Sequence, residues 1–167
     1  MREVPEARLK LKGKSYAEPM IRERYLRAFA AAGVEAARIV FSGWSPHAAM
    51  LEELAELDIA FDPLPFSGLL TSCEALWMGV PVVTLAGLRP VERQTGGLLT
   101  RVGLGDLIAR TTDDYVAIVR GLAHAPERRR NLRQGMRARL LASPPLDEPG
   151  FARTVEAAYR QLWAAAP

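Results

Sequence analysis

The chain has 167 residues, a formal charge of +3 and 49% hydrophobic residues, proportions typical of a globular domain long enough to bury a continuous core. No apolar run approaches the roughly 18 to 20 residues that span a bilayer, and the charged N-terminus lacks a signal-peptide pattern. The single cysteine, Cys73, excludes an internal disulfide and any multi-cysteine zinc site. From these features together we expect one cytoplasmic domain over residues 1–167 without a membrane partner.

Short apolar runs alternate with amphipathic stretches along the chain. The apolar runs predict strands at residues 7–13, 38–43, 58–64, 80–87 and 106–111. The amphipathic stretches predict helices at residues 19–33, 47–57, about 72–78, 92–104, 111–124, 126–142 and about 149–164. We expect Thr112 to be the N-cap of the helix at 111–124. This alternation predicts an α/β fold with a mostly parallel sheet and right-handed crossovers.

In parallel α/β sheets, ligands bind beyond the carboxyl ends of the strands, which here points to the loops at 42–47 and 63–72. The second loop contains Gly68, which allows a tight turn or a close approach to a ligand. Residues 69–72 would then present free N–H groups at a helix start, where the helix dipole favours an anion such as phosphate. Glu74 would lie about one turn inside, within reach of ribose hydroxyls.

A purely structural interpretation of the same turn stays open. Thr71 and Glu74 fit the capping-box pattern, in which the acidic side chain returns to a backbone N–H at the helix start. His47 likewise fits either a ligand-lining position or an ordinary surface histidine near a helix start. Cys73 is expected to be a small buried residue, and the three tryptophans are expected to be packing residues: Trp44, Trp77 and Trp163.

The basic excess gathers in residues 126–139, "PERRRNLRQGMRAR", which predict a helix. No aromatic residue interleaves with these arginines, so nothing here supports the stacking of nucleic-acid bases, and we expect no nucleic-acid partner. We favour a solvated helix face, and an arginine face that docks on another domain is equally compatible with the sequence.

The run "CEALWMGVPVVTLAG" resembles the C-terminal catalytic half of the O-linked N-acetylglucosamine transferases, in particular the bacterial SPINDLY-like members of glycosyltransferase family 41. The similarity extends upstream through "LKGKSYAEPMIRERYLRAF" and downstream through "FARTVEAAYRQLW", and so covers nearly the whole chain. It implies a GT-B glycosyltransferase, built from two Rossmann-like halves, of which this chain would be most of the C-terminal, UDP-holding half.

The resemblance also implies a donor site. The turn of Gly68, Leu69, Leu70, Thr71 and Ser72 would hold the diphosphate at a helix N-terminus, and Glu74 would bind the ribose. The preceding loop would contact the uracil and ribose through a second group of residues: Ser45, His47 and Met50. The donor would be UDP-N-acetylglucosamine or another UDP-sugar, with no metal and no cofactor expected.

Three positions depart from the family pattern. Leu69 and Leu70 replace hydroxyl or imidazole groups expected near the phosphates, and Met50 replaces a histidine expected near the ribose. Backbone N–H groups do not depend on side-chain identity and would still bind phosphate. Three lost polar contacts at roughly 1 kcal/mol each would weaken donor binding by about two orders of magnitude.

The implied parent enzyme transfers the sugar to serine or threonine hydroxyls of acceptor proteins. Its other parts, an N-terminal catalytic half and tetratricopeptide repeats, are the expected partners, and the family's first strand and helix of this half are expected to precede residue 1. We find no evident base for the acceptor hydroxyl and expect the isolated chain to be inactive. The alternative is a degenerate, non-catalytic scaffold or interaction domain of the same fold.

Overall fold

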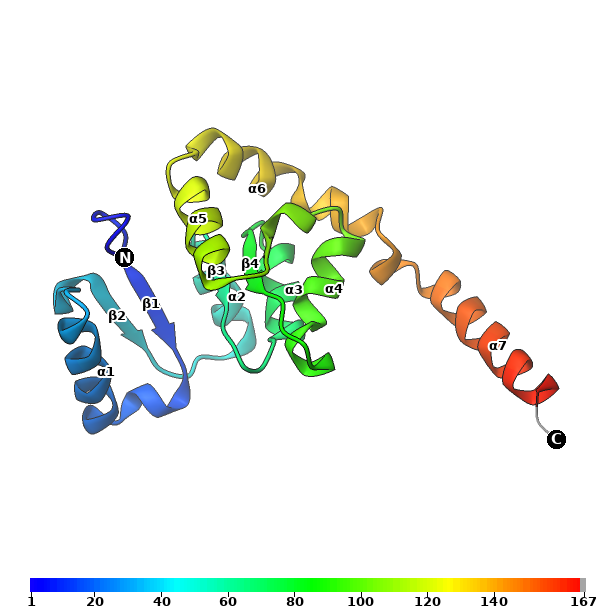
Figure 1. The fold of residues 1–167 in the computed structure, drawn as a ribbon, viewed down its shortest axis with the longest axis horizontal. Coiled ribbons are helices and arrows are strands. Elements are labelled where there is room, and N and C mark those ends of the chain that lie inside the picture. Colours follow the sequence, from blue (N-terminus) through cyan, green and yellow to red (C-terminus); the bar gives the residue numbers. More distant parts are fainter. Residues whose placement is uncertain (166–167) are drawn as a thin grey trace. The chain divides into compact units, whose positions relative to one another are not determined.

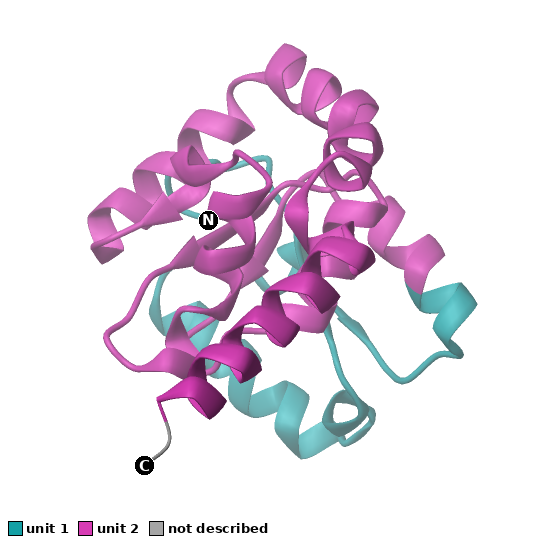
Figure 2. Cartoon of the chain, turned by 90° about the vertical axis from the view of Figure 1, so that its right-hand side faces the viewer, with its two compact units in different colours: residues 1–50 teal, residues 51–167 magenta. Residues whose placement is uncertain are grey.

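The computed structural model describes residues 1–165, which form two compact units, one of residues 1–50 and one that begins at residue 51 (Figure 2). In the first unit, strand β1 (Leu9–Lys12) pairs in parallel with β2 (Ile39–Ser42), with Leu9 opposite Ile39. The connection between them contains three helical segments: η1 (Lys14–Ala17), α1 (Pro19–Ala31) and η2 (Ala36–Arg38). Helix α2 (His47–Ala55) crosses the boundary between the two units.

The second unit contains a three-stranded parallel sheet of order β3–β4–β5, formed by β3 (Ala60–Asp62), β4 (Val82–Leu85) and β5 (Ile108–Ala109) (Figure 1). Its longer helices are α3 (Leu69–Trp77), α4 (Gln94–Arg101), α5 (Thr112–Ala123), α6 (Pro126–Leu141) and α7 (Glu148–Ala164). Three short 3₁₀ segments complete it: η3 (Pro90–Glu92), η4 (Gly105–Leu107) and η5 (Pro144–Leu146).

The core of the second unit lies around β4. Val82 and Val83 are both buried although they face opposite sides of the strand, as expected for the central strand of a parallel sheet. Side chains from four helices and η4 complete the core: Leu76, Leu99, Leu107, Leu122 and Met136. The carboxyl end of β3 and the start of α3 are thus attached to the most rigidly packed part of this unit.

The predicted α/β fold with parallel strands is confirmed, and every predicted strand and helix is present. The strands form two separate parallel sheets, whereas we expected one. Two predicted helix starts are wrong: α3 begins at Leu69 instead of residue 72, and Thr111, not Thr112, caps α5 through a reciprocal pair of hydrogen bonds with Asp114. Among residues 1–165, no helix is long and apolar enough to cross a membrane.

Candidate functional site

The start of α3 is an open helix N-terminus. Gly68 is its N-cap residue and provides no side-chain cap, and the N–H of Ser72 donates to the Gly68 carbonyl at 2.7 Å. The N–H groups of Leu69, Leu70 and Thr71 precede this first helical bond, so they have no acceptor within the helix. They point at the end where the helix dipole is positive, which makes this turn suited to an anion.

The capping-box interpretation of this turn is wrong. Thr71 lies inside the first turn of α3 and does not precede the helix, so Thr71 is not the N-cap residue. Glu74 therefore does not occupy the third helical position that a capping box requires. Leucine is a strong helix former, and the helix therefore extends back through Leu69 and Leu70 until it reaches Gly68. The expectation of a free N–H at Ser72 is also wrong, because that N–H makes the first helical bond.

The side chains around the turn divide into an exposed and a buried set. Leu70 is 72% exposed, and Leu69 and Thr71 are exposed as well. Ser72 is buried, and its hydroxyl lies 3.0 Å from the Thr95 hydroxyl. Glu74 is half-buried one turn into the helix. A ligand at this turn would therefore meet backbone N–H groups and leucine side chains before it met any carboxylate.

A buried carboxylate lies beneath the turn, at the last residue of β3. Asp62 is 4% exposed and accepts hydrogen bonds from the Gly68 N–H at 2.6 Å, the Ser67 hydroxyl at 2.8 Å and the Thr84 hydroxyl at 2.7 Å. Sequence reasoning missed this group entirely. The one available signal was an aspartate at the carboxyl end of a predicted strand that feeds a glycine turn.

The second group of predicted residues lies in the first unit, in the loop after β2. Lys12, at the end of β1, donates to the Ser45 hydroxyl at 2.7 Å and to the Gly43 carbonyl at 3.0 Å. His47 is the exposed first residue of α2, and the N–H of Met50 donates to the Pro46 carbonyl at 2.9 Å. Lys12, which the sequence did not single out, thus fixes the loop that carries Ser45.

The tryptophans do not pack as predicted. Trp44, in the same loop, is 68% exposed, and Trp163 on α7 is 86% exposed. Trp77 is partly covered by Arg137, whose guanidinium carbon lies 4.8 Å from the ring centroid. Cys73 is half-buried, not fully buried as expected. Partial burial raises the pKa of its thiol and the neighbouring Glu74 carboxylate raises it further, so it is a poor nucleophile.

The arginines of the basic helix α6 are mostly exposed, as predicted for a solvated face, but several of them also bind the rest of the fold. Four of its arginines donate to carbonyls at the C-terminal ends of α2, α3, α4 and α5: Arg133 to Ala55 and Leu57, Arg137 to Trp77, Arg139 to Val102 and Gly103, and Arg129 to Leu122 and Ala123. Cations at helix C-termini complement the negative end of the dipole. These arginines therefore stabilise the fold itself.

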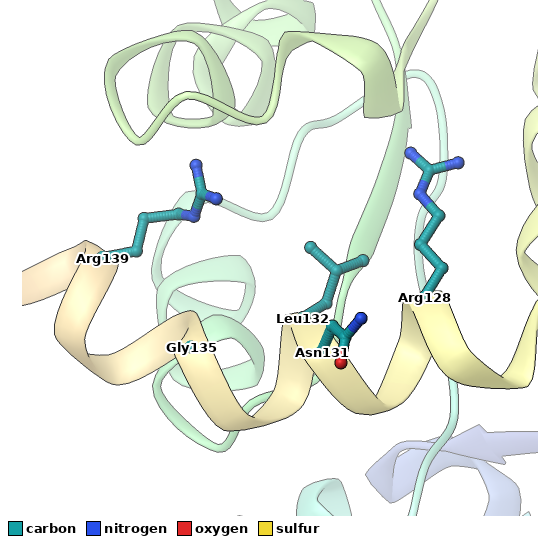
Figure 3. Close-up of a pocket in the computed structure, with 5 residues that line it drawn as sticks. All are labelled: Arg128, Asn131, Leu132, Gly135 and Arg139. Carbon is teal, nitrogen blue, oxygen red and sulfur yellow. The ribbon is translucent and has the colours of Figure 1, made fainter.

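A hollow of about 350 Å³ lies along α6, and Figure 3 shows Arg128 and Arg139 projecting from the same side of the helix there. Its lining residues are Arg128, Asn131, Leu132, Gly135 and Arg139, and no predicted site residue is among them. Arg128 pairs with Asp106, and Arg139 is held by carbonyls. Within residues 1–165 there is also no group of three acidic, histidine or cysteine side chains that could hold a metal ion.

Comparison with known proteins identifies the family. The model for glycosyl transferase family 41 matches residues 1–154. The chain belongs to glycosyltransferase family 41. It is 35% identical over 161 residues to the probable UDP-N-acetylglucosamine–peptide N-acetylglucosaminyltransferase SPINDLY of Hordeum vulgare, and 37% identical over 166 residues to the SPINDLY protein of Arabidopsis thaliana. Each match covers 96% of this chain but only 17% and 18% of the relatives.

A solved family 41 structure shares the fold. The structure of a point mutant of the O-GlcNAc transferase of Thermobaculum terrenum matches this chain with a TM-score of 0.89 and 38% sequence identity. The match covers 95% of this chain and 31% of the chain of that protein. The predicted membership of family 41, the glycosyltransferase class and the Rossmann-like α/β fold are thereby confirmed. The chain spans less than a third of the length of each of these proteins.

Proposed function

We propose that this chain is the UDP-sugar-binding C-terminal part of a family 41 enzyme that transfers N-acetylglucosamine from UDP to serine or threonine hydroxyls of proteins. The observation that carries the proposal is the open N-terminus of α3 at the carboxyl end of β3, where three N–H groups lack helical acceptors. The relatives named as UDP-N-acetylglucosamine–peptide N-acetylglucosaminyltransferases support the choice of donor and acceptor class.

The chemistry assigned to this site is stabilisation of the leaving group. The N–H groups of Leu69, Leu70 and Thr71, together with the dipole of α3, would neutralise the negative charge that develops on UDP as the glycosidic bond breaks. Glu74 would accept hydrogen bonds from the ribose hydroxyls. The loop after β2 would hold the uracil, with Ser45 and His47 in contact with it. The helix terminus would supply the positive potential without a metal ion.

Catalysis in the parent protein would need more than this chain. We assign the acceptor-binding groups and the base for the acceptor hydroxyl to the N-terminal catalytic half, and acceptor selection to tetratricopeptide repeats, in a cytoplasmic enzyme. The isolated 167-residue chain should therefore bind the donor without turning it over. Detectable transfer of sugar to a peptide by the purified chain would contradict this assignment.

Calorimetric titration with UDP tests the donor site. We expect a millimolar or tighter dissociation constant that Glu74→Ala weakens at least about tenfold, the effect of about 1.4 kcal/mol of lost binding energy. Glu156→Ala is the matched control, because Glu156 is an exposed residue of α7 that pairs with Arg160. Equal affinities in the two variants would remove Glu74 from the site.

A non-catalytic scaffold is the second candidate, and the exposed apolar side chains at the turn favour it. Phe66 and Leu70 are 68% and 72% exposed, and Leu69 is 42% exposed. An exposed apolar group of this kind is typical of an interaction surface. Absence of UDP binding at several millimolar would support the scaffold and overturn the donor site.

We also propose that the 167 residues are one nucleotide-sugar-binding domain without its first strand. In a doubly wound sheet of order 3-2-1-4-5-6, strand 1 separates strand 2 from strand 4. Without strand 1, that order leaves the pairs 3-2 and 4-5-6. These are the pairings observed for β1 with β2 and for β3, β4 and β5.

A further inference from the structure

Asp62 has an unusual environment for a carboxylate. It is almost completely buried, yet no lysine or arginine pairs with it in the described part of the chain, and three uncharged donors surround it instead. A buried charge is costly unless hydrogen bonds satisfy it. One oxygen, Oδ1, accepts from the Gly68 N–H, and the other, Oδ2, accepts from the hydroxyls of Ser67 and Thr84.

The hydrogen bonds continue from Ser67 into α4 and α3. The Thr95 N–H donates to the Ser67 hydroxyl oxygen at 2.9 Å, and the Thr95 hydroxyl lies 2.8 Å from Ser67 and 3.0 Å from Ser72. Because a carboxylate only accepts, Ser67 gives its one proton to Asp62, and Thr95 donates to Ser67. The network therefore has one proton arrangement and joins β3, β4, α3 and α4 at the turn.

We propose that Asp62 is the positioning residue of the donor diphosphate site: its carboxylate fixes the turn of Ser67 and Gly68 and so aims the first N–H groups of α3 at the phosphates. This inference rests on the proposed function. Leu69 and Leu70 have no polar side-chain atoms, so phosphate recognition at the turn depends on the direction of the backbone N–H groups. That direction is set by the residue that precedes them, and Asp62 holds its N–H.

The same contact limits where the phosphates bind. The Gly68 N–H is occupied by Asp62, so the anion is left with the N–H groups of Leu69, Leu70 and Thr71. A Cβ built on Gly68 would lie 3.4 Å from Asp62 Oδ1, an ordinary van der Waals contact, so an alanine at position 68 would fit beside the carboxylate. Gly68 itself has φ −89°, so its backbone conformation does not require glycine.

Charge and positioning predict opposite effects of Asp62→Asn, which keeps the size of the side chain. A carboxylate near the phosphates repels them, so loss of its charge alone would tighten UDP binding. Loss of the anchor would loosen the turn and weaken UDP binding, because an amide cannot reproduce three accepted bonds. Uridine contains no phosphate, and its binding should not change in either case.

The experiment is an amide NMR titration of the 167-residue chain with UDP and, separately, with uridine. For Asp62→Asn we expect at least a tenfold weaker affinity for UDP and an unchanged affinity for uridine. Thr84→Val is the matched control, because it removes a donor to the same carboxylate from β4 without touching the turn. We expect it to change the UDP affinity less than threefold.

Four results would overturn the proposal. Tighter UDP binding by Asp62→Asn would show that the carboxylate acts only through its charge, and unchanged binding would show that it has no role at the site. Equal losses of affinity for UDP and for uridine would indicate general damage to the fold. If Asp62→Asn does not fold, Ser67→Ala replaces it, and an unchanged UDP affinity in that variant is the third contradicting result. The fourth result is a wild-type chain that does not bind UDP, which would remove the proposed function and this inference together. In the first three results the wild-type chain still binds UDP, so the proposed function stands.

Discussion

Replacing Arg133 with glutamine should destabilise the unit that begins at residue 51, because Arg133 caps the C-terminal end of a helix distant in sequence. Its Nη1 donates to the Ala55 carbonyl at 2.8 Å, and its Nη2 donates to the Leu57 carbonyl. Ala55 is the last residue of α2, and Leu57 follows that helix. Glutamine is too short to reach both carbonyls and has no charge to complement the helix dipole.

The expected loss follows from two terms. Charge-assisted hydrogen bonds contribute about 1.5 to 3 kcal/mol where they are shielded from water, and less at an exposed side chain such as that of Arg133. A cation at a helix C-terminus adds roughly 0.3 to 1 kcal/mol at the surface. We therefore expect Arg133→Gln to lower the free energy of unfolding by about 1 to 2 kcal/mol, which corresponds to a fall in Tm of roughly 3 to 8 °C.

Urea denaturation followed by circular dichroism measures this difference, and Arg130→Gln on the same helix is the control. Arg130 pairs with Glu127, an exposed neighbour one turn earlier on α6, and such pairs contribute 0.5 kcal/mol or less, on the order of the scatter among surface mutations. Arg133→Lys should retain part of the stability, since an ammonium group can reach one carbonyl. If the Arg133 and Arg130 glutamine variants unfold at the same urea concentration, the capping role of α6 is refuted.

Two further predictions concern other tight contacts. Gly79→Ala should destabilise the fold by more than about 1 kcal/mol in the same urea assay. Gly79 has φ +81°, and an added Cβ would lie 3.0 Å from the Arg133 carbonyl oxygen. An unchanged urea midpoint would contradict the packing of α3 on α6. The hydrogen bond from Arg89 lowers the pKa of Glu92, so the contribution of the Glu92 carboxylate to stability should be present above pH 4.5 and disappear as the pH falls through the lowered pKa. The Tm difference between wild type and Glu92→Gln should shrink over that range. A constant Tm difference would contradict this prediction.

The elements of the fold were predictable because their signals are local. Five strands and seven helices follow from the spacing of apolar residues, and each is present. The start of α3 was not predictable from the capping-box pattern. That pattern describes which nearby side chains can cap a helix. At the N-terminal end of α3, however, the N-cap residue Gly68 is held by a hydrogen bond from its N–H to Asp62, six residues earlier. Caps made by distant groups leave no local signature.

The candidate site was predictable only in part, for the same reason. The turn at Gly68 stands out because a glycine follows a strand and precedes a helix. The network beneath it joins Asp62 to Thr84 and Ser67 to Thr95, pairs that are 22 and 28 residues apart. No spacing rule links such residues. The roles of the α6 arginines were not predictable for the same reason, since their carbonyl partners lie at the C-terminal ends of four other helices.

The Asp62 network bears on the choice between a donor site and a scaffold. Buried charged groups rarely add stability over apolar residues of similar volume, and removal of such groups in favour of apolar packing is often neutral or stabilising. A turn that served only to connect β3 to α3 would need no buried carboxylate with three donors. The apolar side chains of Leu69 and Leu70 favour the scaffold interpretation. They do not affect the backbone N–H groups at the start of α3 or the hydrogen bond from the Gly68 N–H to Asp62. The arrangement that remains is one that fixes a backbone anion site, which favours the donor site over the scaffold.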